Sequence, residues 1–182
     1  MLDETIVDEN AENTGDVDEM LLEKSLEPKV RLITFQLKNE VYGVEVCNVR
    51  EILLLNQSFP VPGAPHFVMG ITNIRGNVLT IIDARKRFNL PGIDLKDSEY
   101  SESARMIVME SGEATAAVLV DSVSDVIDVE KESIDLNPKI KVHGESMYIS
   151  GVVTNPEGLV IILNVEEFLA EDGPGMDMAV GL

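Results

Sequence analysis

The amino-acid sequence predicts an all-β protein made of two copies of one β-strand module. Short runs of alternating apolar and polar residues recur along residues 30–163, and turn residues separate them, which is typical of antiparallel strands. Strands at this close spacing favour a barrel or a sandwich over a parallel sheet. Two segments of the chain also match two later segments in the same order, which indicates an internal duplication.

Four predicted hairpins account for most of the strands. Val30–Lys38 alternates apolar and polar residues, as a strand with one buried face does, and a turn at Asn39-Glu40 leads into the next strand. Asn155-Pro156-Glu157-Gly158 suits a type I turn, because proline stands second and glycine fourth. The predicted strand pairs are 30–38 with 41–46, 70–75 with 78–82, 105–110 with 114–120, and 151–154 with 159–163.

The duplication is visible as two shifts of the chain against itself. Residues 41–53 fall on 115–127 at a shift of 74 positions, and residues 70–88 fall on 151–169 at a shift of 81. A residue that the module needs for its structure should occur in both copies, whereas a residue found in one copy is better suited to contact. Arg75 is of the second kind, because Pro156 stands at its place in the second copy.

Charge divides the chain into three parts. Residues 1–28 carry ten acidic residues and one basic residue, and we expect a largely disordered acidic leader with a weak helical stripe at 17–26. Residues 29–171 form the predicted domain, and residues 172–182 a flexible tail. The 182 residues carry a net charge of −19, which argues against partners such as nucleic acid and against an anionic membrane surface.

Few residues are suited to metal or cofactor chemistry. The single cysteine, Cys47, allows no internal disulfide, which fits a reducing cytoplasm, and it is predicted to be a packed thiol. With only His66 and His143 beside it, the chain has too few ligands for a structural zinc site. No phosphate-binding loop, dinucleotide fingerprint or nucleophile elbow is present. We therefore expect no metal and no cofactor.

Two aspartates supply the only alternative in which the chain is an enzyme. Asp83 and Asp121 each end an apolar strand, and paired carboxylates can do general acid–base work, as in a small acidic hydrolase. The simpler interpretation is that each caps a short helix, over 84–88 and 122–126 respectively. The sequence therefore favours a protein without catalytic residues.

The proline-rich segment 59–65 cannot be a regular strand or helix. It is a stiff loop of small and apolar residues that ends close to Phe67, Val68 and Met69. Two interpretations remain open at this point. The loop either folds over the core or presents an apolar edge to a helix of a partner protein.

Four segments in order resemble the family of chemotaxis coupling proteins, CheW, over about residues 29–171. They match its strand followed by V-x-E-I, its P-x-P-x-x-P…G-x-x-N-x-R-G run, its V-D-x-V-x-x-V run, and the family's ending. The sequence departs from the family's L-P-V-I-D-L-R pattern, where it has LTIIDAR. The matching segments are 41–53, 60–76, 118–127 and 148–169.

The resemblance implies a fold, a function and partners. The fold is two intertwined five-stranded SH3-like β-barrels with short helices and an apolar core between them. The function is that of a non-enzymatic adaptor, which couples the cytoplasmic tips of transmembrane chemoreceptors to the regulatory domain of the CheA histidine kinase. It implies a cytoplasmic protein, recruited to receptor arrays beneath the inner membrane and monomeric in isolation. The alternative is a standalone CheW-like binding module of a two-component pathway outside chemotaxis.

The family motifs also imply partner-binding residues. Val49 and Glu51 lie in the V-x-E motif, which we predict to be a turn, and Val126 lies in the V-x-x-V run. Glu51 and Arg75 are predicted to form an ion pair that fixes the groove between the two barrels, where the resemblance implies that the receptor tip packs. A side chain at position 70 would intrude on a close approach between two backbone segments. The residues implied in partner binding are Val49, Glu51, Gly70, Asn73, Arg75, Gly76 and Val126.

Overall fold

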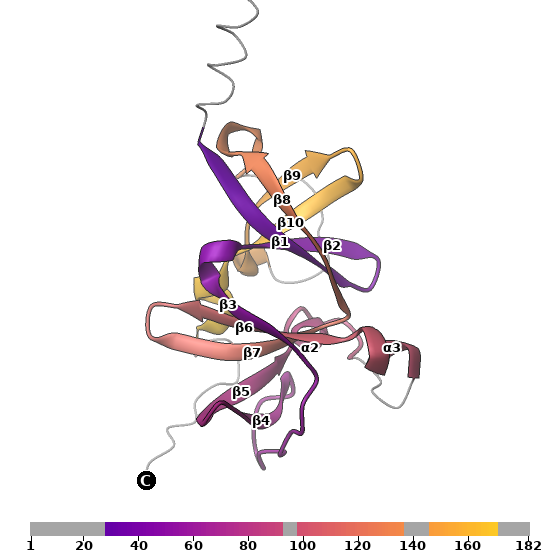
Figure 1. Cartoon of the computed structure of the whole chain (residues 1–182), viewed down its shortest axis with the longest axis vertical. Helices are drawn as coiled ribbons and strands as arrows, with labels where there is room; N and C mark the ends of the chain where they lie inside the picture. Colours follow the sequence, from indigo (N-terminus) through magenta and orange to yellow (C-terminus); the bar gives the residue numbers. More distant parts are fainter. Residues whose placement is uncertain (1–27, 93–97, 137–145, 171–182) are drawn as a thin grey trace, which may run out of the picture.

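The computed structural model describes residues 28–92, 98–136 and 146–170, and the leader and tail predicted from the sequence lie outside these residues. The described part contains ten strands and several short helices (Figure 1). The strands are β1 (Lys29–Leu37), β2 (Glu40–Glu45), β3 (Val49–Leu54), β4 (Val68–Ile74), β5 (Asn77–Asp83), β6 (Arg105–Ser111), β7 (Ala114–Val120), β8 (Ser122–Glu130), β9 (Ile149–Asn155) and β10 (Gly158–Leu163). The helices are the 3-10 helices η1 (Val46–Asn48), η2 (Lys131–Ser133) and η3 (Ser146–Tyr148), and α2 (Ala84–Arg87), α3 (Ser98–Ser103) and α4 (Val165–Leu169).

The strands form two five-stranded sheets that exchange segments of chain. Barrel A has the strand order β8-β1-β2-β10-β9, and barrel B has the order β3-β6-β7-β5-β4. The described part of the chain therefore begins in barrel A, crosses to barrel B after β2, and returns to barrel A after β7. In each sheet an isolated bridge links the segment that follows one edge strand to the opposite edge strand. The bridge pairs Phe59 with Ile71 of β4 in barrel B and Asp135 with Val152 of β9 in barrel A. The prediction of an all-β fold with two intertwined five-stranded units is confirmed.

The predicted duplication matches the strand orders. The shift of 74 places β2 and β3 on β7 and β8, and the shift of 81 places β4, β5 and α2 on β9, β10 and α4. Equivalent strands hold equivalent places in the two sheets. Even an irregularity repeats, because the pairing of β3 with β6 skips a residue after Val49 and the pairing of β8 with β1 skips residues after Val123, its equivalent. Both copies thus contain the same β-bulge.

Three apolar clusters fill the described part of the molecule, and strand alternation explains them. In β7, Val118 faces the space between the sheets, while its neighbours Ala117 and Leu119 face the interior of barrel B. A strand buried on both faces needs a nearly continuous apolar sequence, which β7 has. The shared cluster includes Phe35, Tyr42, Phe88, Ile107, Val118 and Phe168; barrel A holds Leu32, Val129, Val153, Val160 and Ile162; barrel B holds Ile74, Ile81, Met106, Val108, Ala117 and Leu119.

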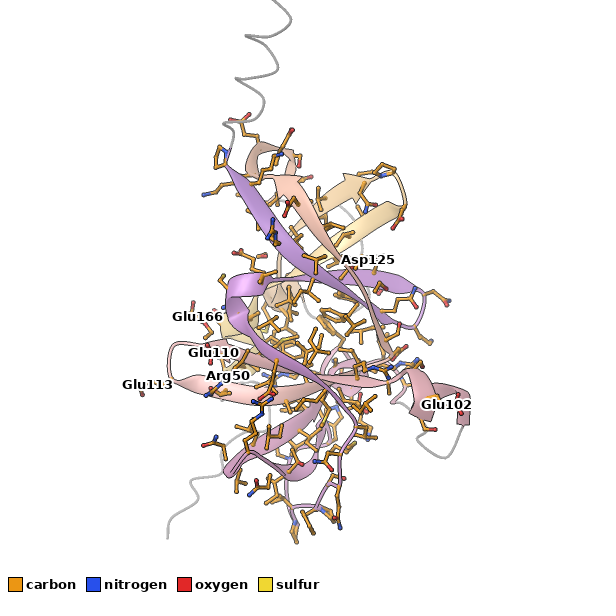
Figure 2. The ribbon with its side chains drawn as sticks, viewed as in Figure 1. Arg50, Glu102, Glu110, Glu113, Asp125 and Glu166 are labelled. Atoms are coloured by element: carbon orange, nitrogen blue, oxygen red, sulfur yellow. The ribbon has the colours of Figure 1, made fainter. Side chains whose placement is uncertain are left out.

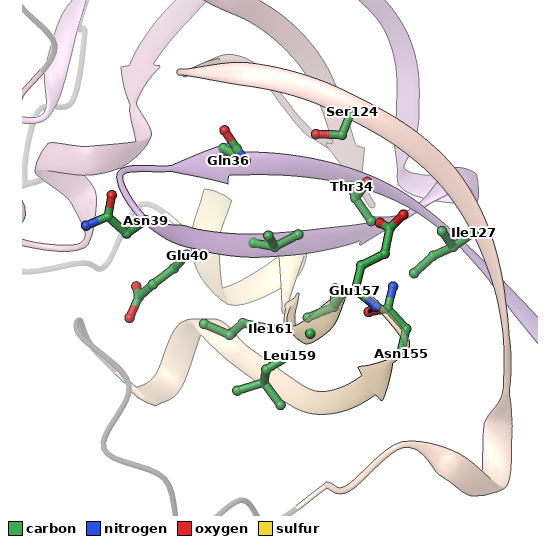
Figure 3. Close-up of a pocket in the computed structure, with 13 residues that line it drawn as sticks. Thr34, Gln36, Asn39, Glu40, Ser124, Ile127, Asn155, Glu157, Leu159 and Ile161 are labelled. Carbon is green, nitrogen blue, oxygen red and sulfur yellow. Dashed lines mark hydrogen bonds between the residues drawn. The ribbon is translucent and has the colours of Figure 1, made fainter.

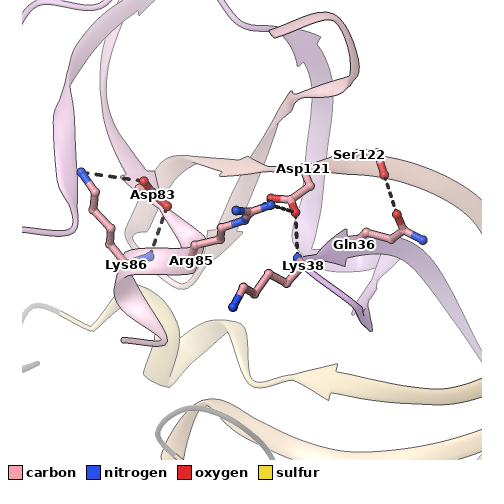
Figure 4. A network of polar contacts seen from close by, with 7 residues as sticks. All are labelled: Gln36, Lys38, Asp83, Arg85, Lys86, Asp121 and Ser122. Carbon is pink, nitrogen blue, oxygen red and sulfur yellow. Dashed lines mark hydrogen bonds and ion pairs between the residues drawn. The ribbon is translucent and has the colours of Figure 1, made fainter. Parts of the chain in front are cut away.

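The two aspartates lead into different elements of structure. Asp83 is the N-cap of α2, because its carboxylate accepts a hydrogen bond from the backbone N–H of Lys86 at 3.2 Å, as predicted. The prediction for Asp121 is wrong, because residues 122–130 form β8 in place of a helix. The Asp121 carboxylate instead forms a buried ion pair with Arg85 (Figure 4). Pairing of β8 with β1 outweighs the local capping pattern.

Two further expectations need correction. Val49 and Glu51 do not lie in a turn, because the chain turns one step earlier, at η1, and both residues belong to β3. Cys47 is not a packed thiol, because it lies in η1 and is exposed. A connection between two sheets runs over the surface, so its apolar neighbours in sequence do not bury it.

We predict that Cys47 is accessible to alkylating reagents but reacts slowly near neutral pH. Local desolvation and the nearby Glu45 carboxylate raise the pKa of the thiol, whose Sγ lies 3.6 Å from Glu45 Oε2. At a pH below the pKa of the thiol, a higher pKa leaves a smaller fraction of the cysteine as thiolate. The thiolate is the form that reacts with the alkylating reagent. Iodoacetamide labelling followed by mass spectrometry should become faster in Glu45→Gln at pH 8. Equal labelling rates in the two proteins would contradict this role for Glu45.

Candidate partner-binding site

The predicted ion pair of Glu51 and Arg75 is present in barrel B. Glu51 lies on β3 with its side chain 21% exposed, and Arg75 lies at the tip of the β4–β5 hairpin with its side chain 78% exposed. A terminal nitrogen of Arg75 lies 3.0 Å from Glu51 Oε2. An ion pair that is as exposed to solvent as this one contributes only about 0.2–1 kcal/mol to stability. Its effect is to hold the hairpin tip against β3, with the guanidinium facing solvent.

The tip of the hairpin is built to present Arg75. Arg75 and Gly76 are the two loop residues, with φ of 52° and 89°, the positive values that a type I′ turn requires. The Asn73 side-chain oxygen accepts a hydrogen bond from the backbone N–H of Gly76 at 2.9 Å. Asn73 and Gly76 therefore shape the turn, and Arg75 is the residue that the turn exposes.

Gly70 lies at a close approach between two backbone segments, as the sequence predicts. Its φ is 154°, and a Cβ at this position would lie 2.4 Å from the backbone oxygen of Phe59. Two hydrogen bonds of 2.8 Å between the backbones of Phe59 and Ile71 hold the proline-rich loop against β4 at this point. The second copy repeats the arrangement, since a Cβ on Gly151 would lie 2.9 Å from the backbone oxygen of Asp135. The close approach is thus a property of the module.

A pocket of about 300 Å³ lies between β3 and the β4–β5 hairpin; we call it the barrel B pocket. Both members of the ion pair line it, together with Arg50, which approaches Glu110 of the neighbouring strand β6 to 4.0 Å (Figure 2). Two arginines and one glutamate line it, so the lining has one more cation than anion in a chain that is strongly acidic overall. Its lining residues are Arg50, Glu51, Ile74, Arg75, Asn77, Leu79 and Val108.

The structure brings most of the predicted site residues together, but not all of them. Glu51, Asn73, Arg75 and Gly76 meet at the hairpin tip, whereas Val49 begins β3 and packs partly against the shared core. Val126 lies in barrel A, on β8, and is 59% exposed. It is the equivalent of Ile52 on β3, which is 40% exposed. Each barrel therefore shows solvent an apolar side chain at the same place on an edge strand.

Sequence reasoning missed the polar groups that join the barrels. Arg85 Nε donates to Asp121 Oδ1 at 2.7 Å, and the backbone N–H of Lys38 donates to Asp121 Oδ2 at 2.7 Å. Arg87 lies over the ring of Phe67, 4.2 Å from its centre, and 4.9 Å from that of Tyr148. A cationic residue just after a predicted helix cap is usually a surface residue, so the sequence held no signal of burial.

The described residues offer little to catalysis. Asp83 and Asp121 are both buried and hold the structural partners named above, which argues against their use as general acid and base. Within the described ranges no three potential ligands among His, Cys, Asp and Glu gather where a metal ion could bind. None of the described helices is long and apolar enough to span a membrane.

Comparison with known proteins identifies what this architecture is similar to. Residues 31–173 match the family model described as the CheW-like domain. The chain is 31% identical over 140 residues to the chemotaxis protein CheW of Klebsiella aerogenes, covering 77% of this chain and 81% of the relative. It is 33% identical over 132 residues to CheW of Rhizobium meliloti, covering 72% and 81%. The crystal structure of the scaffolding protein TtCheW from Thermoanaerobacter tengcongensis is similar with a TM-score of 0.71 and 26% identity, covering 82% and 93%.

Proposed function

Because this chain belongs to the CheW-like family, we propose that it is a non-enzymatic adaptor that couples transmembrane chemoreceptors to the CheA histidine kinase. In this proposal one surface of the domain binds the cytoplasmic tip of a methyl-accepting chemotaxis protein and another binds the regulatory domain of the kinase. The protein acts in the cytoplasm, at receptor arrays beneath the inner membrane, and is a monomer when isolated.

The arginine at the tip of the β4–β5 hairpin carries the proposal. Asn73 and Gly76 shape the turn, Glu51 orients the guanidinium, and the side chain of Arg75 remains 78% exposed. Holding a cation in one orientation while it faces solvent contributes little to folding. The arrangement is suited to contact with a partner, and the second copy of the module has Pro156 at this position.

Replacing Arg75 by alanine should weaken binding of the kinase regulatory domain. We expect the unchanged protein to bind with micromolar affinity or better, about −8 kcal/mol, and Arg75→Ala to lose about fivefold or more, as residues that dominate an interface do. Glu51→Ala should have a smaller effect in the same direction, because it frees the guanidinium without removing it. Isothermal titration calorimetry measures both, with a variant lacking residues 1–28 alongside to show whether the leader takes part.

Arg31→Ala is the matched control for this experiment. Arg31 is also an exposed arginine in an ion pair, with Asp128 at 2.7 Å, but it lies on barrel A and away from the hairpin tip. Its affinity for the kinase domain should equal that of the unchanged protein. If Arg75→Ala and Glu51→Ala both bound kinase and receptor as the unchanged protein does, the ion pair would have no part in binding.

A further inference from the structure

The duplication gives barrel A a pocket at the place where barrel B has one. The barrel A pocket, of about 510 Å³, lies between β1, β2, β8 and the tip of the β9–β10 hairpin (Figure 3). The two repeat shifts and the strand pairing relate its lining to that of the barrel B pocket. Thr34, Ser124, Asn155, Gly158 and Val160 of barrel A correspond to Val108, Arg50, Ile74, Asn77 and Leu79 of barrel B.

The two pockets differ in the sign of their charge. Two arginines and one glutamate line the barrel B pocket, whereas the charged residues that line the barrel A pocket are Glu40 and Glu157, with no cation among them. The positions of the ion pair have also changed. Asp125 corresponds to Glu51, but Pro156 corresponds to Arg75, and the acidic Glu157 comes next at the hairpin tip. Barrel A therefore keeps a carboxylate at the position of Glu51, gains Glu157 at the hairpin tip in place of Gly76, and lacks the cation.

The floor of the barrel A pocket is apolar, and its polar groups hold the strands together. Val41 and Ile127 line it half-buried and pack on the core of barrel A. The buried Thr34 hydroxyl donates to the backbone oxygen of Asp125 at 3.0 Å and accepts from the backbone N–H of the same residue. Figure 3 shows the Glu157 side chain extending across the pocket towards Thr34, with Glu40 at the other end beside the β1–β2 turn.

We infer that the barrel A pocket is a docking site for a segment of a partner protein that presents an arginine between apolar side chains. The partner's guanidinium would meet Glu157, as Arg75 meets Glu51 within barrel B, and its apolar neighbours would cover Val41 and Ile127. Arginine suits the site better than lysine, because its planar group can donate two hydrogen bonds to one carboxylate. The site goes beyond the proposed function, since its chemistry does not depend on which signalling protein carries the segment.

A peptide titration of the full chain tests the site without any signalling partner. The probe is a cyclised peptide with the sequence of residues 71–79, a hairpin tip with an arginine between apolar residues, and the matched probe carries Arg75→Gln. In ¹⁵N NMR spectra we expect the arginine probe to shift the backbone signals of Gln36, Ser124 and Glu157. The glutamine probe should bind about threefold to tenfold more weakly, and high salt should reduce the difference.

Two variants of the chain test whether the Glu157 carboxylate is the group that binds the arginine of the probe. Glu157→Gln should weaken the arginine probe by a similar factor and leave the glutamine probe unchanged. Glu113→Gln, at the exposed tip of the β6–β7 hairpin (Figure 2), should change neither. Both side chains are exposed, so neither change should disturb the fold. Unchanged signals in the rest of the spectrum of each variant would verify that the fold is intact. Equal binding of the two probes, an unaffected Glu157→Gln variant, shifts confined to other surfaces, or no shifts up to the solubility limit would each overturn the assignment.

Discussion

Replacing Asp121 by alanine should lower the free energy of unfolding by about 3–5 kcal/mol, the usual cost of removing one partner from a buried ion pair. Its side chain is 9% exposed and that of Arg85 is 6% exposed, so the guanidinium would be left without its carboxylate in a place that water hardly reaches. The same change frees the backbone N–H of Lys38. Urea denaturation followed by circular dichroism measures the loss.

The expected effect arises from position as much as from charge. Asp121 is the residue at which the chain passes from barrel B to barrel A, Arg85 lies in α2, and Lys38 comes directly after β1. One carboxylate thus joins three segments that belong to both barrels (Figure 4). Asp128→Ala removes an ion pair of similar length from the surface and should change stability little. Equal losses in the two variants would show that the buried pair is not special.

A double variant separates the pair from its surroundings. Arg85→Met combined with Asp121→Leu removes both members of the buried pair, so it should be more stable than Asp121→Ala, in line with other buried pairs replaced by apolar residues. Coupling energies between residues in contact are about 0.5–3 kcal/mol. Strictly additive losses in Arg85→Met, Asp121→Leu and the double variant would contradict the interpretation that losing the carboxylate beside the Arg85 guanidinium is the main cost.

Replacing Gly70 by alanine should destabilise the protein more than the same change at Gly158. Both glycines have φ values that L-residues rarely adopt, 154° and 138°, and each change carries a strain of about 1–3 kcal/mol. At Gly158 a Cβ would meet open space, whereas at Gly70 it would lie 2.4 Å from the Phe59 oxygen and 2.9 Å from its carbonyl carbon. The clash should add about 1–3 kcal/mol, as overpacking does.

The extra loss at Gly70 has a structural signature. To relieve the clash, the proline-rich loop must move away from β4, which breaks the two hydrogen bonds between Phe59 and Ile71. Faster amide hydrogen exchange at these two residues in Gly70→Ala, but not in Gly158→Ala, would locate the damage. Equal stability losses at the two glycines would indicate that backbone strain alone accounts for the effect.

Much of the fold could be predicted because the sequence contains two copies of the same β-strand module. The shifts of 74 and 81 residues relate equivalent strands, and the turn residues at Asn155-Pro156-Glu157-Gly158 fix the β9–β10 hairpin. The role of Asp121 could not be predicted from its neighbours in sequence, because an aspartate before a short apolar run is the pattern of a helix cap. The competing strand pairing of β8 joins residues about 90 positions apart, which no local pattern reveals.

The site could be predicted in part for a similar reason. Family motifs pointed to Glu51 and Arg75, and the structure confirms their ion pair, while their binding roles stay a prediction. The barrel A pocket was not anticipated, although the signal was present, because the comparison that sets Pro156 against Arg75 also sets the acidic Glu157 at the equivalent tip. Burial of Arg85 and the exposure of Cys47 depend on how the two sheets pack, which a single sequence does not show.

Co-sedimentation with receptor membranes tests the adaptor account most directly. Membranes containing the chemoreceptor are mixed with the kinase regulatory domain, with or without this protein, and the pelleted kinase domain is measured. The account predicts that the kinase domain pellets in quantity only when the protein is present, because both partners bind it at once, and that Arg75→Ala reduces the amount. The same amount of pelleted kinase domain with and without the protein would contradict the account.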